Sequence, residues 1–142
     1  MKYLIILTIL ASCSSAMNKP EFKHDADMIC KLASLEFPKS LKKNSEKISD
    51  AEAMEIRVAM TKMLPDLLKC ANQERKQQQT TSKIPLCYMV GTDSKGKITY
   101  SKYYSHEDRQ LSKEFLKCLE KPEVQVKLSI MKSVKITQPV TL

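Results

Sequence analysis

Four cysteines constrain the fold of this chain more than any other feature of its sequence. The chain has 142 residues and five cysteines, and Cys13 lies directly after an apolar N-terminal segment. The other four are far apart: Cys30, Cys70, Cys87 and Cys118. An even number of cysteines in an exported domain is typical of two disulfide bonds, whose three alternative pairings are open at this point. No CxxC motif or cysteine–histidine spacing indicates a zinc site, so we expect disulfides and neither a metal nor a cofactor.

The N-terminus has the pattern of an export signal. Lys2 precedes an apolar run from Leu4 to Leu10, interrupted only by Thr8, and small residues follow at once. A helix that spans a bilayer needs about 20 apolar residues, so this shorter run is typical of a signal peptide. We expect residues 1–12 to be removed from the mature protein.

Two cleavage sites compete at the end of this signal. Leu10-Ala11-Ser12-Cys13 resembles the lipobox of bacterial lipoproteins, in which the cysteine is acylated and becomes the first mature residue. Ser14 is not the aspartate associated with inner-membrane retention, so the resemblance implies a lipid anchor in the outer membrane, facing the periplasm. In the alternative, cleavage after Ala16 releases a soluble periplasmic or secreted protein.

Length and charge limit the nature of the mature chain. Residues 13–22 look like a tether, and residues 23–142 are enough for a single domain of ordinary size. The net charge is +8, and the densest basic group also contains Glu46: Lys39, Lys42, Lys43 and Lys47. A solvated face and contact with an anionic envelope polymer or lipid surface both remain open. Export separates the chain from nucleic acid, so we expect no such partner.

The first helix is predicted from Asp25 to Phe37, where apolar residues recur at helical spacing. Pro38 ends it. The polar stretch 38–48 is rich in lysine, serine and asparagine, and predicts a loop.

A second, longer helix is predicted from about residue 50 to 75. Ser49 and Glu52 form the S-x-x-E pattern of a capping box at its start. Pro65 lies inside it and predicts a kink or an interruption. Six residues share one predicted apolar face: Met54, Val58, Met63, Leu67, Cys70 and Ala71.

Alternating residues predict a β-hairpin over residues 84–104. The first strand divides its side chains between two faces, with Ile84, Leu86, Tyr88 and Val90 on one and Pro85, Cys87 and Met89 on the other. Because proline donates no backbone hydrogen bond, Pro85 predicts that this strand begins there or lies at an edge.

A third helix and two further strands complete the predicted order. Ser105 is the expected N-cap, with Glu107 and Asp108 in the first turn. Alternation after Pro122 predicts strands over residues 124–130 and 134–140. The order is then α-α-β-β-α-β-β, an α+β domain with helices on one face of a small, mostly antiparallel sheet.

The cysteines in the second and third helices occupy matching positions. Each completes an apolar i, i+4, i+7 set: Met63-Leu67-Cys70 and Leu111-Phe115-Cys118. Two helices on one sheet face would bring these sets together. We therefore favour a Cys70–Cys118 disulfide, which leaves Cys30–Cys87 by exclusion.

From about residue 50 to 142 the chain resembles the cysteine-paired TonB-like C-terminal domain. The resemblance depends on Cys70, the hairpin at Asp93–Ile98, Cys118, and the last strand with Pro139. It implies the fold and binding of partners through an exposed strand edge, here in the last strand: Val134, Ile136 and Val140. The long spacer of energy transducers is missing, so energy transduction is not implied.

No pattern indicates an enzyme. His106 falls in the first turn of a predicted helix, and His24 lies in a polar tether beside Asp25 and Asp27. No phosphate-binding loop, G-x-S-x-G or H-E-x-x-H motif occurs. We expect a non-enzymatic envelope lipoprotein that acts as a small binding or scaffolding module. The alternative is a soluble disulfide-stabilised inhibitor or immunity-like protein.

Overall fold

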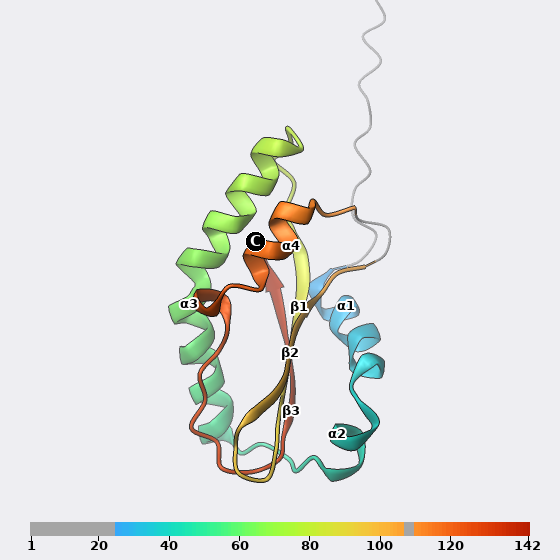
Figure 1. Ribbon diagram of the computed structural model, residues 1–142, viewed down its shortest axis with the longest axis vertical. Coiled ribbons are helices and arrows are strands. Elements are labelled where there is room, and N and C mark those ends of the chain that lie inside the picture. Colours follow the sequence, from blue (N-terminus) through green and yellow to red (C-terminus); the bar gives the residue numbers. More distant parts are fainter. Residues whose placement is uncertain (1–24, 107–109) are drawn as a thin grey trace, which may run out of the picture.

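A three-stranded antiparallel sheet separates two layers of helices (Figure 1). The computed structural model describes residues 25–106 and 110–142. Their elements run in this order: α1 (Ala26–Ala33), a 3-10 turn (Ser34–Glu36), α2 (Lys39–Asn44), α3 (Asp50–Gln77), β1 (Pro85–Thr92), β2 (Ile98–Tyr104), α4 (Lys113–Leu119), a second 3-10 turn (Pro122–Val124) and β3 (Lys135–Thr141). The strand order is β2-β1-β3. The α+β class is confirmed.

The central strand β1 divides its side chains between two cores, as its alternation predicted. Leu86, Tyr88 and Val90 pack with α3 and α4. Cys87 and Met89 pack with α1 and α2. Helices therefore cover both faces of the sheet rather than one, because β1 is apolar on both sides.

The stretch 38–48, predicted as a loop, contains the short helix α2. Pro38 ends the first helical segment, as expected, and it is also the N-cap of α2. The reason for the helix is Leu41, whose buried side chain lies against the β1 backbone at Gly91.

Helix α3 starts with the predicted capping box between Ser49 and Glu52. It continues through Pro65 without interruption. Its predicted apolar face was wrong at the N-terminal end, because Met54 and Val58 are 57% and 48% exposed. Ile56 takes the core position instead.

Helix α4 begins later than predicted. Its N-cap is Ser112 rather than Ser105, and the Ser112 side chain accepts a hydrogen bond from the backbone N–H of Phe115. Leu111 consequently precedes the helix, whereas Phe115 and Cys118 are buried within it. The predicted first-turn acids Glu107 and Asp108 lie outside the described residues.

Residues 124–130 do not form the predicted strand. Val124, Val126 and Ile130 are buried in the core next to α3, which explains their alternation. Their backbone forms turn and side-chain hydrogen bonds instead of a strand ladder. The Val124 N–H donates to the Lys121 carbonyl at 3.1 Å, and the Val126 N–H donates to the Tyr88 hydroxyl at 3.0 Å. Only one strand, β3, follows α4 within the part of the chain described.

One disulfide joins a helical layer to the sheet, and the other joins the two helices of the opposite layer. Cys30–Cys87 joins α1 to β1, and Cys70–Cys118 joins α3 to α4. This is the pairing that the matched helical positions favoured. Disulfides are typical of oxidising compartments outside the cytoplasm. None of the helices in the described ranges is long and apolar enough to cross a bilayer.

Candidate functional site

Within residues 25–106 and 110–142, no other strand pairs with the backbone groups at the outer edge of β3. Ile84 and Leu142 exchange N–H···O bonds of 2.8 and 3.0 Å beside β1 and β3. Hydrogen-bonded pairs alternate along an antiparallel ladder, so the next such pairs include Leu86–Val140 and Tyr88–Gln138. The residues between them therefore direct their backbone away from β1: Lys135, Thr137, Pro139 and Thr141. Pro139 lies at an outward position, where its missing N–H disturbs no ladder bond.

Of the three residues predicted to form the binding edge, Ile136 and Val140 belong to β3 and Val134 directly precedes it, but all three side chains belong to the core. Val134, Ile136 and Val140 are 0%, 6% and 8% exposed and pack against the α3 layer. Any partner at this edge would meet the backbone of the alternate residues. Sequence alone could not make this distinction, since it depends on the register with β1.

A hollow of about 300 Å³ lies between α3 and the edge of β3. Met60, Leu64 and Leu67 form its α3 wall, and Pro139 and Val140 belong to its β3 wall. Leu64 is 39% exposed. The hollow is therefore a mainly apolar space, with Thr61 and Gln138 also in its lining, directly beside strand backbone that pairs with no other strand in the described residues.

Arg57 lies on the rim of this hollow. Its side chain is exposed, and no ion pair is found for it within residues 25–106 and 110–142. A cation in this place favours an acidic group on whatever occupies the hollow.

The outer edge of β2 also has no strand neighbour among the described residues, and β2 contains no proline. Cys87 and Met89 direct their backbone groups away from β3 and toward β2. They form hydrogen-bonded pairs with Tyr104 and Lys102 of β2. The backbone of Ser101 and Tyr103 then points outward. In the described part of the chain, no hydrogen bond to the backbone of either residue is found outside the sheet ladder.

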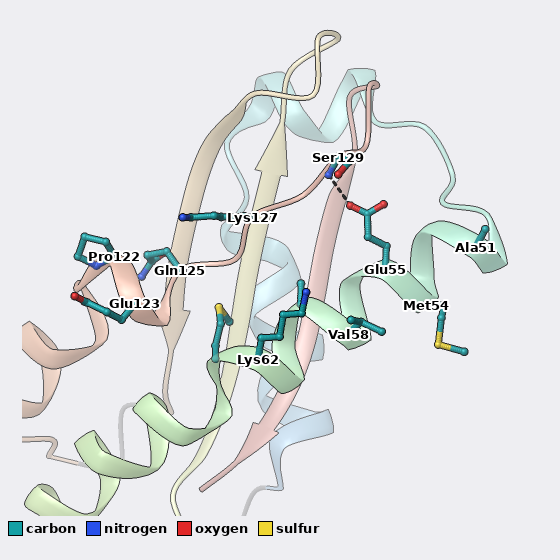
Figure 2. Close-up of a pocket in the computed structure, with 12 residues that line it drawn as sticks. Ala51, Met54, Glu55, Val58, Lys62, Pro122, Glu123, Gln125, Lys127 and Ser129 are labelled. Atoms are coloured by element: carbon teal, nitrogen blue, oxygen red, sulfur yellow. Dashed lines mark hydrogen bonds between the residues drawn. The ribbon is translucent and has the colours of Figure 1, made fainter.

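A second groove, of about 660 Å³, lies between α3 and the segment from Pro122 to Ser129. Figure 2 shows α3 supplying one wall and that segment the other. The Ser129 N–H donates to the Glu55 carboxylate at 2.5 Å and joins the two walls. Met54 and Val58, which were predicted to share the apolar face of the helix with Met63 and Leu67, line this groove instead. Ile56, Ala59 and Met60 form a second apolar stripe at helical spacing, and this is the stripe that faces the core. It was the signal in the sequence that Met54 and Val58 could lie outside the core.

A polar network lies beneath β2 on the α3 side of the sheet. The Tyr88 hydroxyl lies 2.9 Å from the Ser101 hydroxyl and 3.2 Å from the Gln125 amide oxygen. The Tyr103 hydroxyl donates to the Val124 carbonyl at 2.7 Å. Burial raises the pKa of both tyrosines above its ordinary value. These contacts hold residues 124–126 to the sheet, and the network includes no nucleophile paired with a base.

Glu74 is the one fully buried acid found in the described ranges. Both its oxygens accept hydrogen bonds from Ser112 and Gln78. It is satisfied by helix-capping contacts, so its role is structural. No cluster of three metal-binding side chains is found in the same ranges.

The basic group predicted from the sequence lies mostly on α2. Three lysines of the basic group, Lys39, Lys42 and Lys43, lie exposed on α2, and the Lys42 ammonium donates to the Leu35 carbonyl. Cys13, the predicted lipidation site, and His24 lie outside the described residues.

No protein-family model matches the chain, and no curated protein or solved structure is significantly similar to it. The TonB-like resemblance therefore stays a prediction.

Proposed function

We propose that this chain is a non-enzymatic lipoprotein of the bacterial cell envelope, anchored through Cys13, whose domain captures an extended segment of a partner protein at the β3 edge. The segment would add a fourth strand to the sheet, with main-chain hydrogen bonds supplying affinity. The single observation that carries the proposal is the apolar hollow beside the unpaired β3 backbone.

The hollow also defines the chemistry of the segment. Successive side chains of a strand point to opposite faces, so every second side chain of an added strand would face α3. We expect an apolar residue opposite Leu64 and an acidic residue near Arg57. Pro139 removes one donor from the edge, and this limits uncontrolled strand addition.

Seven-residue peptides, the length of β3, test the proposal. A phage-displayed library with apolar residues at alternate positions is selected against the purified domain, and bound peptides are mapped by amide hydrogen exchange. We expect protection of the Thr137 and Thr141 amides, loss of binding in Leu64→Lys and Thr137→Pro, and unchanged binding in Ser101→Pro. Selected peptides that protect neither β3 amide would show that this edge is not the binding site.

The anchor is tested separately. An acylated Cys13 at the mature N-terminus, measured by mass spectrometry, supports the lipoprotein. A free Met17 supports the second candidate, a soluble periplasmic or secreted inhibitor or immunity-like protein. That candidate is favoured only by the Ser14-Ser15-Ala16 sequence, and it would use the same β3 edge.

A further inference from the structure

The second open edge, that of β2, is complementary to itself. The strand reads Ile98-Thr-Tyr-Ser-Lys-Tyr-Tyr104, with Ser101 at its centre. The Ser101 backbone is one of the outward-facing positions established by the register with β1. A two-fold axis beside Ser101 would therefore place a second copy of β2 antiparallel to the first, with the two strands fully overlapped.

The backbone groups match in this register. Ser101 and Ser101 of the second copy form a hydrogen-bonded pair that exchanges both N–H···O bonds. Tyr103 lies opposite Thr99 of the second copy on either side of the axis. The paired groups are those left without a ladder partner in the isolated chain, so no existing sheet bond is broken.

The side chains favour the same register. Lys102 lies opposite Tyr100 of the second copy, and symmetry repeats this contact. Such a pair is a non-hydrogen-bonded one, with Cα atoms about 4.5 Å apart. A lysine ammonium over a tyrosine ring is attracted by the ring face. A register centred on Lys102 instead would set two lysines directly opposite each other, which is destabilising.

The two side chains are available for this contact. Lys102 is exposed, and no ion pair is found for it in the described part of the chain. The Tyr100 ring is tilted against Phe37, with 5.6 Å between ring centroids, which fixes its position on the α1 side of the sheet. Helix α1 packs mainly on β1 and β3, and of the β2 side chains Tyr100 and Tyr104 reach the core beneath α1 and α2.

We propose that the chain forms a symmetric dimer through β2, which joins two three-stranded sheets into one sheet of six strands. The proposal goes beyond the function assigned to β3, because it uses the opposite edge. Both β3 edges would then lie at the two ends of the joined sheet. A dimer would present two capture sites, and a partner with two binding segments would gain avidity.

Sedimentation equilibrium of the full exported chain, carrying Cys13→Ser to prevent acylation, tests the dimer. We expect the average mass to rise with concentration toward that of two chains. Lys102→Glu, which leaves the backbone unchanged, should weaken the dimer about tenfold by removing two cation–π contacts. Ser101→Pro removes the central N–H and should abolish the dimer. Thr137→Pro, the matched change at the β3 edge, should leave it intact.

Cross-linking tests the register without relying on a proline variant. Tyr100→Cys and Lys102→Cys chains are purified separately and then oxidised alone or mixed. We expect a disulfide-linked dimer only in the mixture, because the register sets position 100 opposite position 102. Equal linking of each variant alone, or a monomeric mass at every soluble concentration, would overturn the proposal. Thr137→Pro separates the two hypotheses, since it should abolish peptide capture and preserve the dimer.

Discussion

The Glu74 carboxylate accepts hydrogen bonds from both the backbone N–H and the hydroxyl of Ser112, which lies 38 residues further along the chain. Glu74 is on α3, one helical turn from Cys70, and Ser112 is the N-cap of α4. Glu74 and Ser112 therefore hold α4 to α3 at the N-cap of α4, and the Cys70–Cys118 disulfide holds it near its C-terminal end. This contact explains why α4 begins at Lys113, although Ser105 also has the residue type of an N-cap.

We expect Glu74→Gln to lower the free energy of unfolding by about 1–3 kcal/mol, because an amide donor would replace an acceptor among buried donors. Ser112→Ala should cost about 1–2 kcal/mol through the lost cap. Urea unfolding of both variants and their double measures the coupling. Asp66→Ala, which breaks the exposed Asp66–Lys69 pair, is the control and should change little. A strictly additive double variant would contradict the contact.

We expect removal of the Cys30–Cys87 disulfide, by Cys30→Ala and Cys87→Ala together, to loosen one layer of the protein. The bond closes a loop of 57 residues, for which chain entropy predicts a loss of about 4 kcal/mol. Amide exchange should accelerate most in α1, because this disulfide joins α1 to β1. Uniform acceleration through α3 and α4 would show that the two cores unfold as one unit.

The two glycines should differ in their tolerance of alanine. A Cβ at Gly96 would lie 1.9 Å from the Ile130 carbonyl oxygen, and Gly96 has a φ of +76°. A Cβ at Gly91 would meet the end of the Leu41 side chain, which can rotate. Gly96→Ala should therefore lower the thermal midpoint much more than Gly91→Ala. Equal shifts in the two melting curves would contradict this difference.

Alkaline pH should destabilise the fold through Tyr88 and Tyr103. Burial raises the pKa of both phenols above the ordinary value of 10.0. Above that pH the unfolded chain loses phenolic protons that the folded chain retains, so stability is full below pH 10 and falls as the pH rises beyond it. Absorbance at alkaline pH should show these tyrosines ionising only as circular dichroism is lost. Tyr88→Phe should reduce the effect, and an unchanged profile would exclude Tyr88 as a source.

The sequence predicted the features that local chemistry decides. The capping box at Ser49 and Glu52, the hairpin and the two faces of β1 depend on residues close in sequence, and all are confirmed. The favoured cysteine pairing also matches the structure, although α4 starts late, because Phe115 and Cys118 keep their relative positions. Spacing within each helix, together with the expectation that both helices cover one sheet face, favoured Cys70–Cys118, and Cys30–Cys87 followed by exclusion.

Features that depend on distant packing could not be predicted. The N-terminal part of α3 has two apolar stripes at helical spacing, one containing Ile56 and the other Val58. Only the contacts of the helix with the sheet decide that Ile56 is buried and Val58 is exposed. Residues 124–130 alternate like a strand because one side is buried under α3. The open edges, and the hollow beside β3, required the strand order β2-β1-β3, which no local pattern encodes.

The Cys30–Cys87 bond also determines how the domain would carry a mechanical load. A pull on the chain before Asp25 travels along α1 only as far as Cys30 and then crosses directly into the central strand. The polypeptide between the two cysteines, including all of α2 and α3, is bypassed. If the proposed anchor at Cys13 holds the chain, tension from it would reach the sheet at β1 and would bypass the α3 wall of the β3 hollow.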